Sequence, residues 1–454
     1  MAGKTEEELI KVRKDKRQKL IDFGVPVYPA VSDRNYTIDK VLAASKEFIA
    51  GMEDLTLAGR LTALRGHGAI IFADLVDESD KIQLFFKSDN LGADFSRLEF
   101  FDIGDFIEVV GKLFITKAGE LTIEVSKFKM LTKSLRPLPE KWHGLTDVET
   151  RYRERYVDLI VNPEVKELFY KRSKIIATLR NFLAKNGFME VDTPTLQPIA
   201  GGAIAKPFST HYNAYDRDVY LRIAPELYLK RLIVGGFEKV FEFARCFRNE
   251  GVDATHNPEF TNLEFYWAYA DYEKLMDLTQ DLLRDVVKHV FGKSEIEING
   301  QIVDFSQGIP KVTFDKFTDG KNTEESFKAA VKKTVNPTFV TNHPTDLLPL
   351  AKKNADDSKV VDSFQLIMGG LELIKAFSEV NDPTDQDERF KEQEKMKQSG
   401  DGEAHEFDAD FIKALEYGMP PCAGWGMGVD RFVMLLCGAK TLREILLFPF
   451  MKEK

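Results

Sequence analysis

Two neighbouring stretches of the chain decide the fold: residues 239–248 read KVFEFARCFR and residues 258–269 read PEFTNLEFYWAY. In each stretch, bulky apolar residues alternate with polar or small ones, which is the period of a β-strand with two different faces. The segment between them, residues 249–257, is polar and contains a glycine. The pattern therefore predicts an antiparallel hairpin with an apolar back and a polar, aromatic front.

The front of this hairpin carries side chains that a solvent-facing surface does not need. Arg248 and Glu264 place a cation and an anion on one face, and Phe260 and Tyr266 add aromatic rings. A surface hairpin with ion pairs is the plain alternative. The functional interpretation is the floor of a site that binds an anion and a cation side by side.

A second group of charged side chains, Glu372, Lys375 and Glu379, follows a turn-like pair of glycines. Strict alternation along a strand puts Glu372 on the opposite face from the other two. We therefore predict a β-bulge between Leu373 and Lys375 that re-aims one of them.

A third group begins with residues 424–428, which read GWGMG and lead into an apolar helical stretch with Arg431 in its first turn. A glycine-rich entry to a helix can hold phosphate, and tight packing explains the glycines equally well. The sequence has no Walker A, HExxH, CxxC or GxSxG pattern. We therefore expect no side-chain nucleophile, and His256 is the one histidine with a functional setting, because of its loop.

The composition is that of a globular protein, with 43% apolar residues. No run of 18 apolar residues and no apolar signal-peptide core occur, so we expect neither a membrane span nor secretion. Three widely spaced cysteines indicate neither a disulfide framework nor a zinc site, and a cytoplasmic location is the simplest expectation. A net charge of −10 argues against generic coating of nucleic acid, without excluding a local basic face.

The chain divides into two parts. Residues 5–22 predict a charged helix, whose basic residues 11–19 form either a solvated face or a surface that follows a phosphate backbone. Residues 55–131 predict four to six short strands in a small barrel or sandwich, for which an oligonucleotide-binding fold is one option. A domain boundary is expected between residues 136–139 and Asp147.

The second part predicts helices over residues 163–187 and 271–291, the latter strongly amphipathic. Residues 292–345 show only a weak pattern, and we expect a loosely organised insertion there.

Several of these strings resemble the signature motifs of class II lysyl-tRNA synthetases. Residues 187–194 are similar to motif 1, residues 247–251, 256–261 and 263–266 to motif 2, and residues 426–431 to motif 3. Residues 201–203 and 221–228 also match, and the resemblance spans roughly residues 8–454.

The resemblance implies an α+β fold with an antiparallel sheet flanked by helices, an N-terminal OB-fold β-barrel, and a homodimer. The implied domains are residues 1–145, a helix plus an OB-fold that reads the anticodon, and residues 146–454, the catalytic domain. In the latter, motif 1 lies near 187–194, motif 2 near 239–269, a variable insertion at 292–338, and motif 3 near 424–436.

The activity implied by the resemblance is lysine–tRNA ligation with ATP and Mg²⁺. Lysine and ATP form lysyl-adenylate, and the lysyl group then passes to the 3′ end of tRNA(Lys). Such chemistry depends on positioning and charge neutralisation at phosphates, which fits the lack of a nucleophile.

The same resemblance implies roles for individual residues. The catalytic residues are Arg248 and Arg431. ATP is held by Arg248, Glu250, His256, Asn257, Phe260, Glu372 and Arg431. Lysine is held by Gly202, Glu226, Arg248, Glu264, Tyr266, Lys375, Phe377 and Glu379. The metal ligands are Glu372, with Gln365 and Glu379 as further candidates. The anticodon contacts are Phe72, Gln83 and Glu120, which otherwise read as a core phenylalanine and two surface polar residues.

Two positions depart from the family pattern. Gln365 stands where a glutamate that helps to bind magnesium is expected, and Lys375 stands where an asparagine near the substrate carboxylate is expected. An amide offers a metal an oxygen ligand but no charge. Two alternatives therefore stay open: a non-catalytic tRNA-binding or regulatory paralogue, and an enzyme that attaches lysine to a protein.

Overall fold

The computed structural model describes residues 5–139, 145–203, 205–348, 350–398 and 407–453. Contacts divide the chain into two units, Met1–Thr146 and Asp147–Lys454. The boundary expected from the sequence falls beside residues 140–144, which lie outside the described residues.

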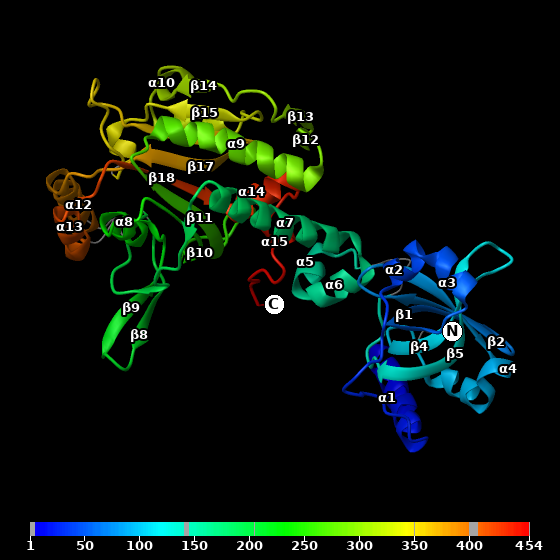
Figure 1. Cartoon of the computed structure of the whole chain (residues 1–454). Coiled ribbons are helices and arrows are strands. Elements are labelled where there is room, and N and C mark those ends of the chain that lie inside the picture. Colours follow the sequence, from blue (N-terminus) through cyan, green and yellow to red (C-terminus); the bar gives the residue numbers. More distant parts are fainter. Residues whose placement is uncertain (1–4, 140–144, 204, 349, 399–406, 454) are drawn as a thin grey trace. The chain divides into compact units, whose positions relative to one another are not determined.

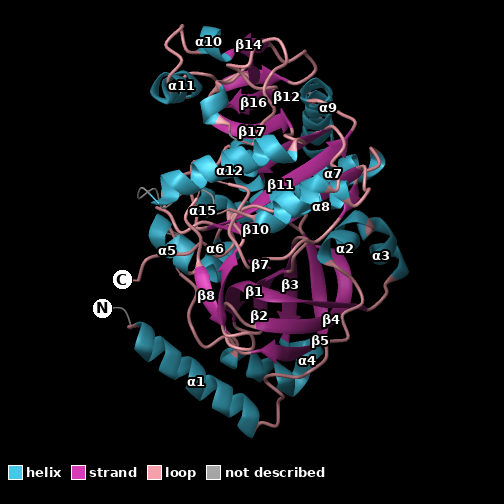
Figure 2. Cartoon of the chain, turned by 90° about the vertical axis from the view of Figure 1, so that its left-hand side faces the viewer, coloured by secondary structure: helices cyan, strands magenta, loops and turns pink. Residues whose placement is uncertain are grey.

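The first unit contains a closed five-stranded barrel, as the expected OB-fold requires (Figure 2). Its strands, in the order β1-β2-β3-β5-β4, are β1 (Leu55–His67), β2 (Ile70–Val76), β3 (Lys81–Lys87), β5 (Leu121–Thr132) and β4 (Phe106–Ile115). Neighbouring strands are antiparallel, except that β3 and β5 are parallel. Alternate side chains, including Leu84 and Phe86, point into the core because successive residues of a strand face opposite sides.

The helices of this unit are α1 (Glu6–Asp22), α2 (Ile38–Ala43), α3 (Ser45–Gly51), α4 (Ser88–Leu91) and the 3₁₀ helix η1 (Gly92–Phe100). The predicted charged helix is confirmed as α1, which begins at a capping box formed by Thr5 and Glu8. The buried Arg13 guanidinium donates to the carbonyl oxygens of Ile103 and Arg136. Part of the basic stretch is therefore structural.

The second unit is built on an eight-stranded sheet in the order β14-β15-β16-β17-β18-β11-β10-β6. The strands are β14 (Lys311–Thr313), β15 (Thr338–Thr341), β16 (Ser363–Met368), β17 (Leu371–Ser378), β18 (Cys422–Gly428), β11 (Glu259–Ala268), β10 (Lys239–Phe247) and β6 (Met189–Glu190). The six central strands are antiparallel, and the two edge strands are parallel to their neighbours. The predicted hairpin is confirmed as β10–β11, with Glu242 opposite Glu264.

Smaller strands lie outside this sheet: β7 (Leu196–Gln197), β8 (Ser209–Tyr212) and β9 (Arg217–Leu221) form one sheet, and β12 (Glu295–Ile298) pairs with β13 (Gln301–Asp304). The helices are α5 (Val148–Arg153), α6 (Arg155–Val161), α7 (Glu164–Lys185), α8 (Glu226–Val234), α9 (Tyr272–Phe291), α10 (Phe314–Phe317), α11 (Glu324–Val331), η2 (Thr345–Leu347), α12 (Pro383–Gln398), α13 (Ala409–Glu416), α14 (Val429–Leu436) and α15 (Leu442–Ile445).

One face of the large sheet is apolar and covered by helices. Figure 1 shows α7 and α9 running beside one another, and their side chains pack with α14 against the sheet residues Phe265, Trp425 and Met427. The helices predicted over residues 163–187 and 271–291 are therefore confirmed as α7 and α9. The opposite face carries the polar side chains of the hairpin, with α8 and α13 packed at one end.

The expectation of a loose insertion over residues 292–345 is wrong. This stretch forms the β12–β13 hairpin, the edge strand β14, two short helices and β15, with Phe314 and Phe327 stacked in a small core. Its strands have only three or four residues, too few to display a period in the sequence. Within the described part of the chain, no helix combines the length and apolar character needed to cross a bilayer.

Candidate active site

The polar face of the sheet holds a cavity of about 440 Å³ whose floor is a strand of glycines. The GWGMG sequence forms the strand β18, which leads directly into α14. Gly424, Gly426 and Gly428 pair with β11 on one side, and the first two also pair with β17. Because alternate residues of β18 are glycines, the floor lacks side chains, and a trough runs between walls on β11 and β17.

One end of the trough is lined by carboxylates. Glu226, at the start of α8, Glu264 on β11 and Glu379 just after β17 all reach the cavity and are all buried. Glu379 Oε1 has no hydrogen-bond partner among the described residues. The Tyr266 hydroxyl donates to Glu264 Oε2 at 3.3 Å. Such a cluster suits a ligand with amino groups, since a buried carboxylate is stable only beside a cation.

A buried lysine organises this acidic end. Lys230 Nζ lies 2.6 Å from Glu226 Oε1 and also contacts Glu379 Oε2. Burial by itself would lower the pKa of Lys230, but the two carboxylates more than offset this effect and raise it. Burial likewise raises the pKa of Glu379, and the Lys230 ammonium opposes that shift.

Glu264 has no such internal cation. Burial, reinforced by the negative charge of Glu226, raises the pKa of Glu264 to about 8. Without a bound cation this carboxyl is therefore largely protonated at neutral pH, and a cationic ligand would draw it into the ionised form.

The middle of the trough presents two cations, Arg248 and Lys375. Neither has an acidic side chain within 4.0 Å in the described residues, and Arg248 Nε is buried without a hydrogen-bond partner. The Arg248 guanidinium lies over the Phe260 ring, 5.1 Å from its centroid. Two unpaired cations that face one cavity predict an anionic ligand.

Arg431, on α14, closes the far end of the cavity together with the loop between β10 and β11. Its guanidinium donates to the Thr255 carbonyl at 3.1 Å and to His256 Nε2 at 2.7 Å. Since arginine only donates, His256 Nε2 accepts, and Nδ1–H donates to Asp253 at 2.8 Å. Glu250 and Asn257 also line this end, as do Gly202 and Phe377 elsewhere in the cavity.

The predicted β-bulge on β17 is confirmed. Leu366 pairs with Ile374 and Ile367 pairs with Glu372, so Leu373 is the extra residue, one position before the expected centre. Leu373 and Ile374 are both buried, and Glu372 now reaches the same cavity as Lys375. Burial raises the pKa of Glu372, and the nearby Lys375 and Arg431 charges oppose that shift.

The three candidate metal ligands do not meet. Glu379 lies at the opposite end of β17 from Glu372, about 20 Å away at roughly 3.3 Å per residue, so the two cannot share an ion. Gln365 is buried opposite Lys375 on the neighbouring strand, and its Oε1 has no hydrogen-bond partner. Among the described residues there is also no group of three His, Cys, Asp or Glu side chains that could hold a metal. Glu372 alone offers a free carboxylate to an ion that arrives with a ligand.

Some of the supporting residues were not found from the sequence. Lys230 reads as an ordinary helical lysine, and only its i, i+4 spacing from Glu226 hints at the pair. Arg222 bonds Glu242 and the Thr193 carbonyl, and so neutralises a carboxylate that faces Glu264 across the hairpin. The alternating glycines were visible in the sequence, but the strand that they form was not predicted.

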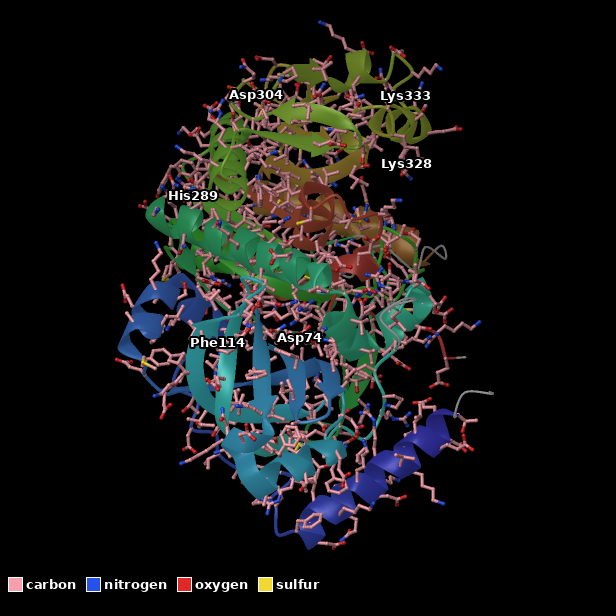
Figure 3. The ribbon with its side chains drawn as sticks, turned by 90° about the vertical axis from the view of Figure 1, so that its right-hand side faces the viewer. Asp74, Phe114, His289, Asp304, Lys328 and Lys333 are labelled. Atoms are coloured by element: carbon pink, nitrogen blue, oxygen red, sulfur yellow. The ribbon has the colours of Figure 1, made fainter. Side chains whose placement is uncertain are left out.

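The first unit brings its three predicted residues onto one outer face of the barrel. Phe72 and Phe85 face each other across β2 and β3, with ring centroids 5.1 Å apart. Phe114, which is labelled in Figure 3, has its ring centroid 6.0 Å from that of Phe85. Gln83 Nε2 donates to Glu120 Oε2 at 2.9 Å. Half-buried aromatic rings beside polar edges are typical of surfaces that stack and read unpaired bases.

Comparison with known proteins agrees with this geometry. Residues 147–452 match the family described as tRNA synthetases class II (D, K and N), and residues 55–131 match an OB-fold nucleic acid binding domain. The lysine–tRNA ligase of Carboxydothermus hydrogenoformans is 46% identical over 98% of each chain. Those of Thioalkalivibrio sulfidiphilus and Moorella thermoacetica are each 44% identical over 99% or more of both chains. With its glycine-floored site, its barrel and these full-length matches, the chain belongs to the class II tRNA synthetases of the D, K and N group.

Proposed function

We propose that the cavity binds L-lysine and ATP together and joins them as lysyl-adenylate, and that the lysyl group then passes to the 3′ end of tRNA(Lys). The chain is a lysine–tRNA ligase, as its full-length relatives are. The proposal of lysine as the substrate rests on one observation: the same trough has unpaired cations in its middle and buried carboxylates at one end. A dibasic amino acid has the complementary charges.

The lysine would lie along the trough. Glu226 and the backbone at Gly202 hold its α-amino group. Gly202 lies directly against Glu226, since an added Cβ would be 3.1 Å from Glu226 Cβ, so the two residues border the same part of the cavity. Glu264, Tyr266 and the orphaned Oε1 of Glu379 receive the ε-ammonium, and Phe377 flanks the side chain. An uncharged side chain would leave these carboxylates unpaired, which costs far more than a lost methylene contact.

ATP would occupy the other half of the cavity. Phe260 stacks against the adenine, Arg431 covers its other face and reaches the γ-phosphate, and Glu250, His256 and Asn257 hold the nucleotide. Arg248 lies between the two substrates and pairs with both the lysine carboxylate and the α-phosphate. The chemistry needs no side-chain nucleophile, since the substrate carboxylate attacks the phosphorus and the fixed cations neutralise the charge that develops.

Magnesium would enter with ATP and be held at Glu372. A Mg²⁺ ion usually takes one or two carboxylates plus substrate phosphates, and the free Glu372 carboxylate fits that role. Bound there, the ion would neutralise phosphate charge.

We assign tRNA recognition to the first domain, residues 1–145, and the formation of lysyl-adenylate to the second, residues 146–454. The barrel face formed by Phe72, Gln83 and Glu120 would bind the anticodon by stacking and base-edge contacts. This barrel also favours tRNA over a protein as the acceptor of the lysyl group.

A homodimer would cover the exposed edge of the large sheet. Tyr156 on α6, Tyr170 on α7 and Met189 on the edge strand β6 are exposed, with 60%, 48% and 43% of their surfaces accessible. We place the protein in the cytoplasm, where ATP, lysine and tRNA are available together. Sedimentation velocity tests the dimer: wild-type protein should sediment as a dimer and Tyr170→Glu as a monomer.

The experiment that tests the function is amino-acid-dependent ATP–pyrophosphate exchange across the twenty amino acids and ornithine, followed by charging of tRNA(Lys). Exchange with lysine and subsequent charging support the proposal. Absence of exchange by folded protein would instead favour a non-catalytic tRNA-binding role, and exchange without charging would favour a protein acceptor.

A further inference from the structure

The cross-strand pair Gln365–Lys375 is the feature of the site that the roles above leave unexplained. The two residues face each other on β16 and β17, and Lys375 in turn faces the bare Gly426 on β18. Lys375 therefore has an amide on one side and open cavity on the other. Its ammonium has no carboxylate within 4.0 Å among the residues that the structure describes, although Glu372 lies on the same wall.

The donor set around this pair does not suit a metal ion fixed by the protein. Gln365 supplies only a neutral oxygen, and the neighbouring His343, whose Nδ1 bonds Ser363 and whose pKa burial lowers to about 3, offers only a neutral ring nitrogen, which a hard cation does not prefer. The Lys375 ammonium would repel a cation between positions 365 and 372. A hard divalent ion prefers charged oxygen ligands, and here only Glu372 provides one.

The amide has a second effect, on Lys375 itself. A carboxylate at position 365 would lie directly opposite the ammonium and form a cross-strand ion pair with it. Gln365 cannot do so, and the positive charge remains available to a ligand in the trough. The amide of Gln365 therefore keeps the Lys375 ammonium available to bind an anion in the trough.

We propose that Lys375 is a tethered cation that neutralises the lysine carboxylate and the α-phosphate during adenylate formation, in place of a metal ion held between positions 365 and 372. Gln365 acts as a positioning residue that leaves this charge uncommitted. This inference rests on the proposed arrangement of lysine and ATP in the cavity. It implies that the loaded site binds one divalent ion, at Glu372.

Ion counting tests the proposal without relying on turnover. Mn²⁺ is titrated into protein saturated with lysine and α,β-methylene-ATP, and bound ions are counted by electron paramagnetic resonance. Wild-type protein is expected to bind one Mn²⁺ per site, and the double variant Gln365→Glu/Lys375→Asn more than one. Two or more ions per wild-type site, or the same count in both proteins, would overturn the proposal.

Exchange kinetics provide the second test. Lys375→Met should raise the KM for lysine about 10- to 100-fold, the range for losing a charge-assisted hydrogen bond. Gln365→Glu should impair exchange by pairing with Lys375, and the double variant should be less impaired than the two single changes combined, with a steeper Mg²⁺ dependence. Strictly additive effects would count against the pairing, and an unchanged KM in Lys375→Met would remove Lys375 from the site.

Two control variants distinguish the role proposed for Lys375 from the assignment of the trough as the lysine site. Lys328→Met removes an exposed lysine on α11 (Figure 3) that is paired with Glu324 and does not line the cavity, and it should leave the lysine KM unchanged. Glu379→Gln should raise the lysine KM if the trough is the lysine site. An effect of Glu379→Gln together with none from Lys375→Met would refute the tethered cation alone, whereas no effect from either would refute the site.

Discussion

The Lys230 ammonium lies 2.6 Å from the Glu226 carboxylate, one turn away on α8, and its other neighbour is Glu379 from the opposite wall of the cavity. An internal lysine thus occupies the acidic end of the cavity that we propose as the lysine site. It engages Glu226 and one oxygen of Glu379, and it leaves Glu264 and the other oxygen of Glu379 without a cation among the described residues.

Removal of this internal cation should destabilise the fold. Lys230→Met leaves two buried carboxylates without their partner, and we expect the free energy of unfolding to fall by about 3–5 kcal/mol. Urea denaturation of wild-type and variant protein measures the change. Free L-lysine should restore stability to the variant more than to the wild type, because its ammonium can approach the same carboxylates; an unchanged midpoint would contradict the structural role of Lys230.

The affinity for lysine should depend on pH through Glu264. With a pKa of about 8, this carboxyl is mostly protonated at pH 7 in the empty site, and a neutral acid attracts an ammonium weakly. The KM for lysine is therefore expected to fall as the pH rises from 7 to 8.5. Glu264→Gln should have a higher KM that stays flat over this range, and the KM for ATP serves as the internal control.

A rise in pH that strengthens lysine binding through Glu264 should also destabilise the ligand-free fold through the same carboxyl. Between its ordinary value of 4.5 and about 8, Glu264 keeps its proton in the folded state and has lost it in the unfolded chain. The stability of the ligand-free wild type should therefore decline, relative to Glu264→Gln, as the pH rises through this window. Melting temperatures recorded at intervals from pH 5 to 8.5 would show the two curves diverging, and parallel curves would refute the shift.

The glycine floor predicts a sharp steric effect. A Cβ at Gly424 would lie 2.1 Å from Glu379 Oε1 and 2.5 Å from Tyr266 Cε1, so Gly424→Ala must displace the two groups to which we assign the ε-ammonium. We expect the lysine KM to rise at least about tenfold, equivalent to about 1.4 kcal/mol, with little change in the KM for ATP. Gly308→Ala is the matched control, because its Cβ would meet only Gln280 Oε1 at 3.9 Å.

The basic stretch of α1 gives a prediction for tRNA. Arg13 and Lys16 are engaged within the unit, Lys16 by an ion pair with Asp102, whereas Lys11 and Lys14 are exposed. If these two contact phosphates, Lys11→Glu/Lys14→Glu should weaken tRNA binding and reduce the slope of log K against log salt by about 1 to 2. Filter binding at several salt concentrations measures this, and an unchanged slope would assign α1 a purely structural role.

Much of this architecture could be predicted from the sequence because its strands are long. The β10–β11 hairpin has enough alternating residues to fix which side chains share a face. On β17, strict alternation would place Glu372 and Lys375 on opposite faces, and this mismatch predicted the bulge. The short strands of residues 292–345 offered no such period. Lys230 was missed because its partner Glu379 comes from a distant strand, and pairing across the fold leaves no local signal.

The bare floor of β18 has an evolutionary consequence. Because the glycines of β18 contribute only backbone to the floor of the cavity, the side chains that can contact a ligand stand on two walls. Each wall can change in evolution without the other. Substitutions on β16 and β17, such as those at Gln365 and Lys375, can redistribute charge along one wall without altering the Glu264 wall, to which we assign part of the choice of amino acid. Such a layout lets one scaffold diversify its chemistry and its substrate along independent routes.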